Sequence, residues 1–266
     1  MAHFHSFLAG ISLLFFSPIF SQAPFDAARL GGEIIFDGKV DEAAWQAVPP
    51  LGLLQQVPNF GQQPSERSEV RLAYDDNYLY LSGKFFLSDN KFYRATSYKR
   101  DTQSPSTDYA GFVIDNFNDY ENAVAFFTTP TGLRWDGTVS NDAQMDDNVS
   151  IDWNTFWDAA ATRMDSGWSA EIRIPWSSLR FVEKDGEVVM GITVWWWMAA
   201  KNEIDMFPLI SNSLGGMSFF KPSQAQRFRF RGIRASKPLY FTPYILAGYQ
   251  EKHDLNENGT AYKKDK

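Results

Sequence analysis

Alternating apolar and polar positions recur through residues 34–232 and predict a series of short β-strands. Two of these, at residues 70–74 and 78–85, flank the polar run Asp75-Asp76-Asn77, which is typical of a hairpin turn. The same pattern predicts further strands at residues 110–114, 123–128, 156–164, 168–174, 188–196 and 227–231. Regularly spaced strands with turn residues between them are typical of an antiparallel β-sandwich. We therefore expect an all-β fold.

Helical segments are expected to be short. One is predicted at residues 41–48, where Asp41 has the side chain of a good N-cap, and one at residues 176–179, where Pro175 stands at the entrance. The one shift in composition that suggests a domain boundary falls near residues 236–238. We expect the sandwich to occupy residues 24–236.

The first residues have the pattern of a secretory signal peptide. Residues 7–20 are apolar apart from Gly10, two serines and Pro18, and the small residues of 21–23 follow. We expect a signal peptide at residues 1–23, with an uncleaved anchor as the alternative. An exported chain without cysteine fits the envelope of a Gram-negative bacterium, in the periplasm or at the outer membrane.

Residues 237–266 differ from the body of the chain. Aromatic and apolar side chains at Leu239, Phe241, Tyr244, Leu246 and Tyr249 are typical of the first strand of an outer-membrane β-barrel. A single such strand would have unpaired edges in lipid, so we expect the chain to be the N-terminal part of a longer protein. The alternative is a tail strand that closes the soluble domain.

Composition excludes several classes of function. The chain has 32 acidic and 25 basic residues and a net charge of −7, which argues against a nucleic-acid partner. It has no cysteine and three histidines, of which His3 and His5 fall in the predicted signal peptide. His253 alone cannot form a catalytic triad or a multi-histidine zinc site, and no haem is expected. No catalytic residue is assigned.

Three blocks of sequence are similar to the family 9 carbohydrate-binding module: residues 35–45 (IFDGKVDEAAW), 69–80 (EVRLAYDDNYLY) and 167–176 (GWSAEIRIPW). The resemblance extends over about residues 33–235 and implies a jelly-roll sandwich. Residues 100–101, 129–132 and 179–181 resemble the subgroup in which this module precedes a bacterial outer-membrane β-barrel of unknown function.

The family binds saccharides by stacking sugar rings on tryptophan and by hydrogen bonds from polar neighbours. In the sugar-binding members a tryptophan lies just before a strand that contains a glutamate. Here residues 105–111 contain no tryptophan, and Gly111 stands where the glutamate falls. The family's arginine falls near Phe126 and Phe127, and its second tryptophan near Leu214. The standard platform is therefore absent.

A replacement platform is predicted in turn-like sequence at residues 134–158. Its stacking residues are Trp135, Trp153 and Trp157, and its hydrogen-bonding residues are Arg134, Asp136 and Asp158. The alternative is that these tryptophans belong to the rim or the core. The three consecutive tryptophans at 195–197 must face alternate sides of a strand, so at least one is expected to be exposed or buried against the barrel.

Acidic loops suggest a cation. Asp115, Asp119 and Glu121 lie in one oxygen-rich loop, and Ca²⁺ prefers such oxygen ligands. Family 9 modules bind structural calcium, so the resemblance implies a calcium site. The alternative is that 32 acidic residues form such clusters by chance. Arg227, Arg229 and Arg231 alternate with phenylalanines, which should face the core while the arginines face outward.

Three functions remain open. The first is a carbohydrate-binding module of an envelope protein, with a saccharide as ligand and the following barrel as partner, linked to carbohydrate catabolism. The second is a structural or gating domain for the barrel that binds no ligand. The third is part of a hydrolase of O-glycosyl bonds, which requires two carboxylates about 5–9.5 Å apart.

Overall fold

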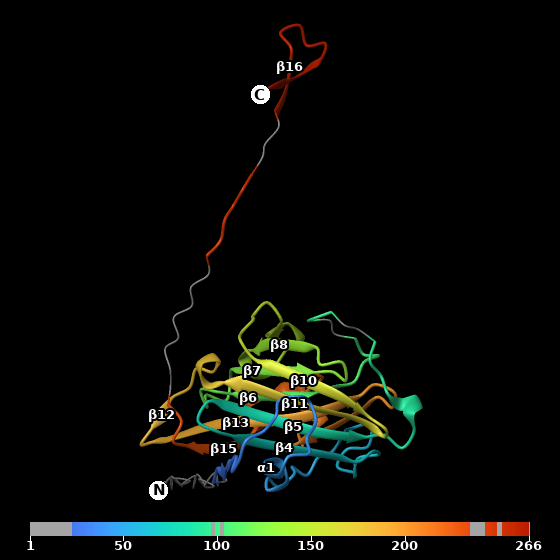
Figure 1. Ribbon diagram of the computed structural model, residues 1–266, viewed down its shortest axis with the longest axis vertical. Helices are drawn as coiled ribbons and strands as arrows, with labels where there is room; N and C mark the ends of the chain where they lie inside the picture. The colour runs from blue at the N-terminus through green and yellow to red at the C-terminus, as the bar shows by residue number, and fades with distance from the viewer. Residues whose placement is uncertain (1–22, 97–98, 102–103, 235–242, 249–251, 266) are drawn as a thin grey trace, which may run out of the picture. The chain divides into compact units, whose positions relative to one another are not determined.

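The computed structural model describes residues 23–96, 99–101, 104–234, 243–248 and 252–265. Its contacts divide the chain into one unit that ends at Ser236 and a second that begins at Lys237. The first unit contains two β-sheets that face each other (Figure 1). Residues 1–22 of the predicted signal peptide lie outside the described residues.

The larger sheet has ten strands, of which seven follow the order β1-β15-β13-β6-β7-β8-β9, while β12 and β14 pair with β13, and β3 pairs with β14. The strands are β1 (Phe25–Asp26), β3 (Leu54–Val57), β6 (Tyr109–Asp115), β7 (Ala123–Thr128), β8 (Arg134–Val139), β9 (Val149–Ser150), β12 (Glu183–Lys184), β13 (Glu187–Met198), β14 (Glu203–Phe207) and β15 (Gln226–Arg231).

The smaller sheet has five strands in the order β10-β11-β5-β4-β2. They are β2 (Ala28–Arg29), β4 (Ser68–Tyr74), β5 (Tyr78–Phe86), β10 (Asp158–Met164) and β11 (Gly167–Pro175). Apart from the parallel pairings of β1 with β15 and β2 with β4, the pairings within the two sheets are antiparallel. The expected all-β sandwich is confirmed.

All eight strands predicted from the sequence are present, and β7 has the predicted bounds. Besides the two-residue strands β1, β2, β9 and β12, the sequence pattern missed β3, β8 and β14. Strand β14 carries two buried acidic residues, Glu203 and Asp205, so it lacks the apolar alternation that identifies a strand. Strand β8 contains Asp136 and Gly137, which are common in turns.

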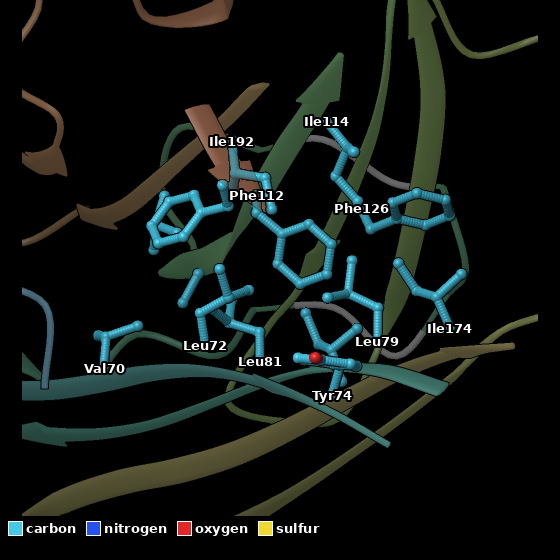
Figure 2. Close-up of a cluster of buried hydrophobic side chains, with 14 of the residues drawn as sticks. Val70, Leu72, Tyr74, Leu79, Leu81, Phe112, Ile114, Phe126, Ile174 and Ile192 are labelled. Carbon is cyan, nitrogen blue, oxygen red and sulfur yellow. The ribbon is translucent and has the colours of Figure 1, made fainter. Parts of the chain in front are cut away.

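The main hydrophobic core lies between the two sheets. Side chains of β4 and β5, such as Leu72 and Leu81, point toward those of β6 and β7, such as Phe112 and Phe126 (Figure 2). Leu79, Phe112 and Phe126 are 0% exposed. Each large apolar side chain buried in this way contributes about 1.5–3 kcal/mol to the free energy of unfolding, before losses of conformational entropy. The inward face of each strand therefore holds the sandwich together.

Two further apolar clusters cover the outer faces of the sheets. The segment from Val40 to Val48 lies on the five-stranded sheet and includes the short helix α1 (Ala43–Gln46), whose Trp45 is fully buried. The predicted cap at Asp41 is wrong, because the N-cap is Glu42, and its carboxylate accepts instead from the Ile35 amide. The ten-stranded sheet is covered by residues 208–224.

That covering segment contains the short 3₁₀ helices η5 (Asn212–Leu214), η6 (Ser218–Phe220) and η7 (Pro222–Gln224). The remaining 3₁₀ helices are η1 (Asn90–Phe92), η2 (Asn141–Ala143), η3 (Asp146–Asn148) and η4 (Trp176–Ser178), the last of which lies in the predicted helical segment after Pro175.

The first described residues join the two sheets at one edge. Phe25 of β1 pairs with Phe228, whereas Ala28 of β2 pairs with Ala73 on the other sheet. Ala27 lies between the two strands and donates its amide to the carbonyl of Arg229 at 2.9 Å. Both sheets are therefore covered at this edge by one continuous stretch of chain.

The second unit contains the two-stranded hairpin β16 (Lys252–Leu255) and β17 (Tyr262–Asp265). Tyr244 and Leu246 are 87% and 90% exposed and lie outside any strand, while Leu239, Phe241 and Tyr249 lie outside the described residues. No helix within the described part of the chain is long and apolar enough to span a membrane.

Candidate functional site

A cleft of about 550 Å³ opens on the outer face of the ten-stranded sheet. Its walls come from β6, β7, β8, β13 and β14, from the covering segment around Phe219, and from the loops near Pro105 and Ile151. This volume lies within the range of about 300–1,000 Å³ that is typical of small-molecule sites. The cleft is the candidate binding site of the domain.

The floor of the cleft consists of buried aromatic rings from Phe127, Trp135, Trp195 and Phe220. The centroids of the Phe127 and Trp195 rings are 4.3 Å apart, and the Trp195 and Phe220 rings meet edge to face at 5.7 Å and 88°. Alternation along β13 explains the arrangement, because Trp195 and Trp197 face the cleft while Trp196 lies in the core between the sheets.

Gly111 of β6 makes room for this floor. It pairs with Trp195 on one side and with Phe127 on the other. A Cβ atom at Gly111 would come within 2.6 Å of Cδ1 and 2.7 Å of Cα of Phe127, and it would also clash with the carbonyl oxygen of Phe126. No side chain fits at this position without a shift of its neighbours, so Gly111 leaves the space that the aromatic floor occupies.

The rim of the cleft is more accessible than its floor. Trp197, Met217 and Phe219 are half-buried, and Ile151 is 44% exposed. The Trp197 indole Nε1 donates a hydrogen bond of 3.2 Å to the carbonyl oxygen of Pro105, which fixes the ring at the mouth. A ligand that enters the cleft meets these side chains first.

Polar groups are scarce in the cleft. Asp146 is the one charged side chain among the described residues that line it. The buried indole Nε1 atoms of Trp135 and Trp195 have no hydrogen-bond acceptor in the described part of the chain. Because an indole N–H can only donate, a ligand that reaches either group would have to present an acceptor oxygen.

The structure divides the six residues of the predicted platform between two faces of the sheet. Trp135 lies in the cleft, whereas Arg134 and Asp136, its neighbours on β8, point to the opposite face. Arg134 Nη1 donates to the carbonyl oxygen of Trp157 at 2.5 Å, and Asp136 accepts from the Thr155 amide at 3.0 Å.

The other three residues of the predicted platform, Trp153, Trp157 and Asp158, contact side chains of the core and of the neighbouring strand. Trp157 is 2% exposed and meets Phe126 edge to face at 5.3 Å in the main core, and Trp153 packs partly buried beside the same ring. Asp158 forms an ion pair of 2.9 Å with Arg173 across β10 and β11. The six residues therefore do not form one platform in this structure.

Sequence reasoning missed most of the cleft. The three consecutive tryptophans at 195–197 were the sequence feature that indicated the cleft, because alternation along a strand places Trp195 and Trp197 on one face. Phe219 and Phe220 gave no such signal, since they lie in the three-residue helix η6, which packs on the sheet from outside.

The three residues of the predicted calcium site do not fit a metal ion. Asp115 is 0% exposed, and its oxygens accept from the amides of Asp119 and Tyr120 and pair with Arg227 at 3.1 Å. Asp119 accepts from the amides of Glu121 and Asn122. Within the described residues, no group of three or more acidic or histidine side chains is arranged to hold a metal.

The pairing with Asp115 also corrects an expectation about β15. Phe228 and Phe230 face the core as predicted, but Arg227 is 8% exposed rather than turned toward solvent. Its guanidinium lies 3.8 Å from the ring centroid of Tyr120 and donates to the carbonyl oxygen of Pro222. Arg227 therefore belongs to the interior of the domain.

The family model described as Carbohydrate family 9 binding domain-like matches residues 35–227. A putative carbohydrate-binding protein from Bacteroides uniformis ATCC 8492 has a similar fold, with a TM-score of 0.58 and 10% identity over 78% of this chain and 99% of that chain. A family 9 carbohydrate-binding module from Caldicellulosiruptor kristjanssonii, in complex with cellotriose, is 15% identical, with a TM-score of 0.47 over 82% of this chain and 99% of that chain. No curated protein sequence matches the chain. Since the family model covers most of the sandwich, the chain belongs to the carbohydrate family 9 binding domain-like family.

Proposed function

We propose that this domain is a carbohydrate-binding module that holds its saccharide in the aromatic cleft. The observation that carries the proposal is the cleft itself, with Trp195 in its floor and Trp197 at its mouth, in a chain of this family. Pyranose rings present an apolar C–H face that aromatic rings bury well, and a few polar groups then fix the orientation.

The cleft favours binding over glycoside hydrolysis. A glycosidase needs two carboxylates on opposite sides of the scissile bond, about 5–9.5 Å apart. Among the described residues that line the cleft, Asp146 alone has a carboxylate. The chemistry of the lining therefore supports a ligand that is held and released unchanged.

We also propose that the module acts at the envelope of a Gram-negative bacterium, next to an outer-membrane barrel formed by residues from 237 onward. The support is the apolar stretch at residues 7–20 and the aromatic pattern between Leu239 and Tyr249. Fractionation of cells that express the chain tests this proposal, since a chain that stays in the cytoplasm contradicts it.

A glycan-array screen of the chain tests saccharide binding. We expect saturable binding that Trp197→Ala weakens at least about tenfold, because the ring at the mouth of the cleft is lost. Trp153→Ala is the matched control, since Trp153 packs on the opposite face of the sheet. Thermal melts of both variants establish that they are folded.

Two outcomes contradict the proposal. Binding that is lost in Trp153→Ala and kept in Trp197→Ala would place the site on the other face. No binding to any glycan by the folded chain would favour the ligand-free structural or gating role.

A further inference from the structure

The floor of the cleft is a poor site for sugar hydroxyls. Four aromatic side chains, from Phe127, Trp135, Trp195 and Phe220, form a continuous apolar surface there. A hydroxyl buried against this surface loses its hydrogen bonds to water, and the ring carbons that it meets offer none in return. A pyranose ring carries several hydroxyls, so pushing a bare sugar onto the floor costs free energy at each of them.

The floor does suit an aromatic ring. Its own rings meet at several angles, with Trp195 and Phe220 edge to face at 88° and Phe127 and Trp195 tilted at 47°. An incoming aromatic ring therefore finds both ring faces and ring edges, the two arrangements in which aromatic pairs attract most strongly. Gly111 widens this surface, because any side chain there would push the Phe127 ring away.

Two polar side chains of the cleft lie at its mouth. Asp146 is exposed, Ser104 is half-buried, and both line the opening. The indole Nε1 atoms of Trp135 and Trp195 are buried, so they add no accessible polar group to the floor. The lining thus changes from aromatic at the floor to polar at the mouth, and a matching ligand has an aromatic end and a hydroxylated end.

We infer that the cleft binds a saccharide with an aromatic substituent, such as an aryl glycoside, with the aryl ring on the floor and the sugar at the mouth. This inference rests on the proposed function, because it names the class of saccharide that the same cleft takes. The aryl ring supplies the buried area, and the sugar hydroxyls remain near water and Asp146.

Isothermal titration with matched pairs of glycosides tests the inference. The probes are the methyl and phenyl β-glycosides of glucose, galactose, xylose and mannose, together with octyl β-glucoside. We expect at least one phenyl glycoside to bind about tenfold or more tightly than its methyl counterpart, and phenyl glucoside to bind more tightly than octyl glucoside when glucose is accepted. Phe220→Leu should reduce the phenyl advantage, since it keeps an apolar side chain on the floor but removes a ring, whereas Trp197→Ala at the mouth should weaken the methyl and phenyl glycosides alike.

The outcomes separate this inference from the proposed function. Equal affinity for methyl and phenyl glycosides would overturn the aryl preference while leaving saccharide binding intact. Octyl glucoside that binds as well as phenyl glucoside would show that apolar area alone decides, which also overturns the aryl ring as the recognised group. Absence of binding to every probe by the folded chain overturns the inference, and the glycan array then decides the proposed function on its own. Trp153→Ala, folded and unchanged in affinity, is the control.

Discussion

The indole Nε1 of Trp45 donates a hydrogen bond of 2.9 Å to Oε1 of Glu171, a carboxylate that is 0% exposed. The other oxygen of Glu171 accepts from the amides of Asp37 and Gly38 at 3.1 and 3.0 Å. Two of the sequence blocks that resemble the family, residues 35–45 and 167–176, therefore meet at one carboxylate. Their role is to fasten the segment that carries α1 onto the five-stranded sheet.

Replacing Glu171 by glutamine should destabilise the domain by about 1–3 kcal/mol. All three groups that face the carboxylate are N–H donors, and an amide NH₂ in place of one oxygen leaves at least one of them unpaired. Urea unfolding followed by tryptophan fluorescence measures the change. Glu183→Gln, in exposed β12, should change stability by no more than about 0.5 kcal/mol. Equal effects of the two variants would show that the Trp45 contact is not important.

Stability should fall as the pH rises from about 5 to about 8. Burial raises the pKa of Glu171 and of Asp108 to about 7, and burial together with the nearby Glu203 raises that of Asp205 to about 8. In the unfolded chain these carboxyls return to about 4, so the native state binds more protons across this window. Their contribution is complete below the unfolded pKa and is lost as the pH passes the folded pKa, by about 1.4 kcal/mol per pH unit for each group at most.

Thermal melts between pH 5 and 8.5 measure this dependence. Asp205→Asn should flatten the upper part of the profile, whereas Asp165→Asn, in the exposed turn before β11, should leave its slope unchanged. Carboxylates with a lowered pKa, such as Glu66 beside Lys201, stabilise the native state when ionised, and this contribution is lost only at more acidic pH. A midpoint temperature that rises from pH 5 to pH 8 would contradict the prediction.

Gly111→Ala should destabilise the domain by about 1–3 kcal/mol or more, because the added Cβ meets the backbone and ring of Phe127. The variant should also weaken ligand binding, since the aromatic floor must shift to admit the methyl group. Gly52→Ala is the control, as a Cβ there has no neighbour within 4 Å. Denaturant unfolding and titration of the same samples give both values, and a Gly111→Ala protein as stable as the control would refute the packing argument.

Arg227→Ala and Arg231→Ala should differ sharply although both residues lie on β15. Removing Arg227 leaves the fully buried Asp115 without its cation, at a cost of about 3–5 kcal/mol. Arg231 is half-exposed in its pairs with Asp26 and Glu187, so its loss should cost about 1 kcal/mol or less. Chemical denaturation of the two variants gives the comparison. Similar losses would mean that Arg227 does not stabilise Asp115.

The strands with regular alternation were predictable because their burial follows their periodicity. Residues 78–85 alternate in sequence and pack against the facing sheet as β5. Strand β14 was not predictable in this way, because Glu203 is buried where it accepts from the Ser65 amide, a contact between residues 138 apart. The local sequence around either residue does not indicate this contact.

The candidate site was harder to predict than the fold. The sequence predicted Trp135 and its polar neighbours together as one platform in a turn, whereas the structure places Trp135 alone of the six in the cleft. Because residues 134–139 form strand β8, the side chains of Trp135 and Asp136 face opposite sides of the sheet. On its side, Asp136 forms an ion pair of 2.6 Å with Arg100. Phe220 reaches the floor from the short helix η6, outside the strands of the sheet, so its place depends on the tertiary fold.

The edge at which β1 and β2 join the two sheets also sets an order of events. Phe25 pairs with Phe228, so the first strand has no partner until nearly the whole domain has been synthesised. Strands such as β4 and β5 find each other through a short hairpin much earlier. Ala28 and Arg29 can pair with β4 early, whereas Phe25 and Asp26 stay unpaired while most of the sandwich assembles. Closure of this edge is therefore a late step of folding, and it requires β15, the last strand of the domain.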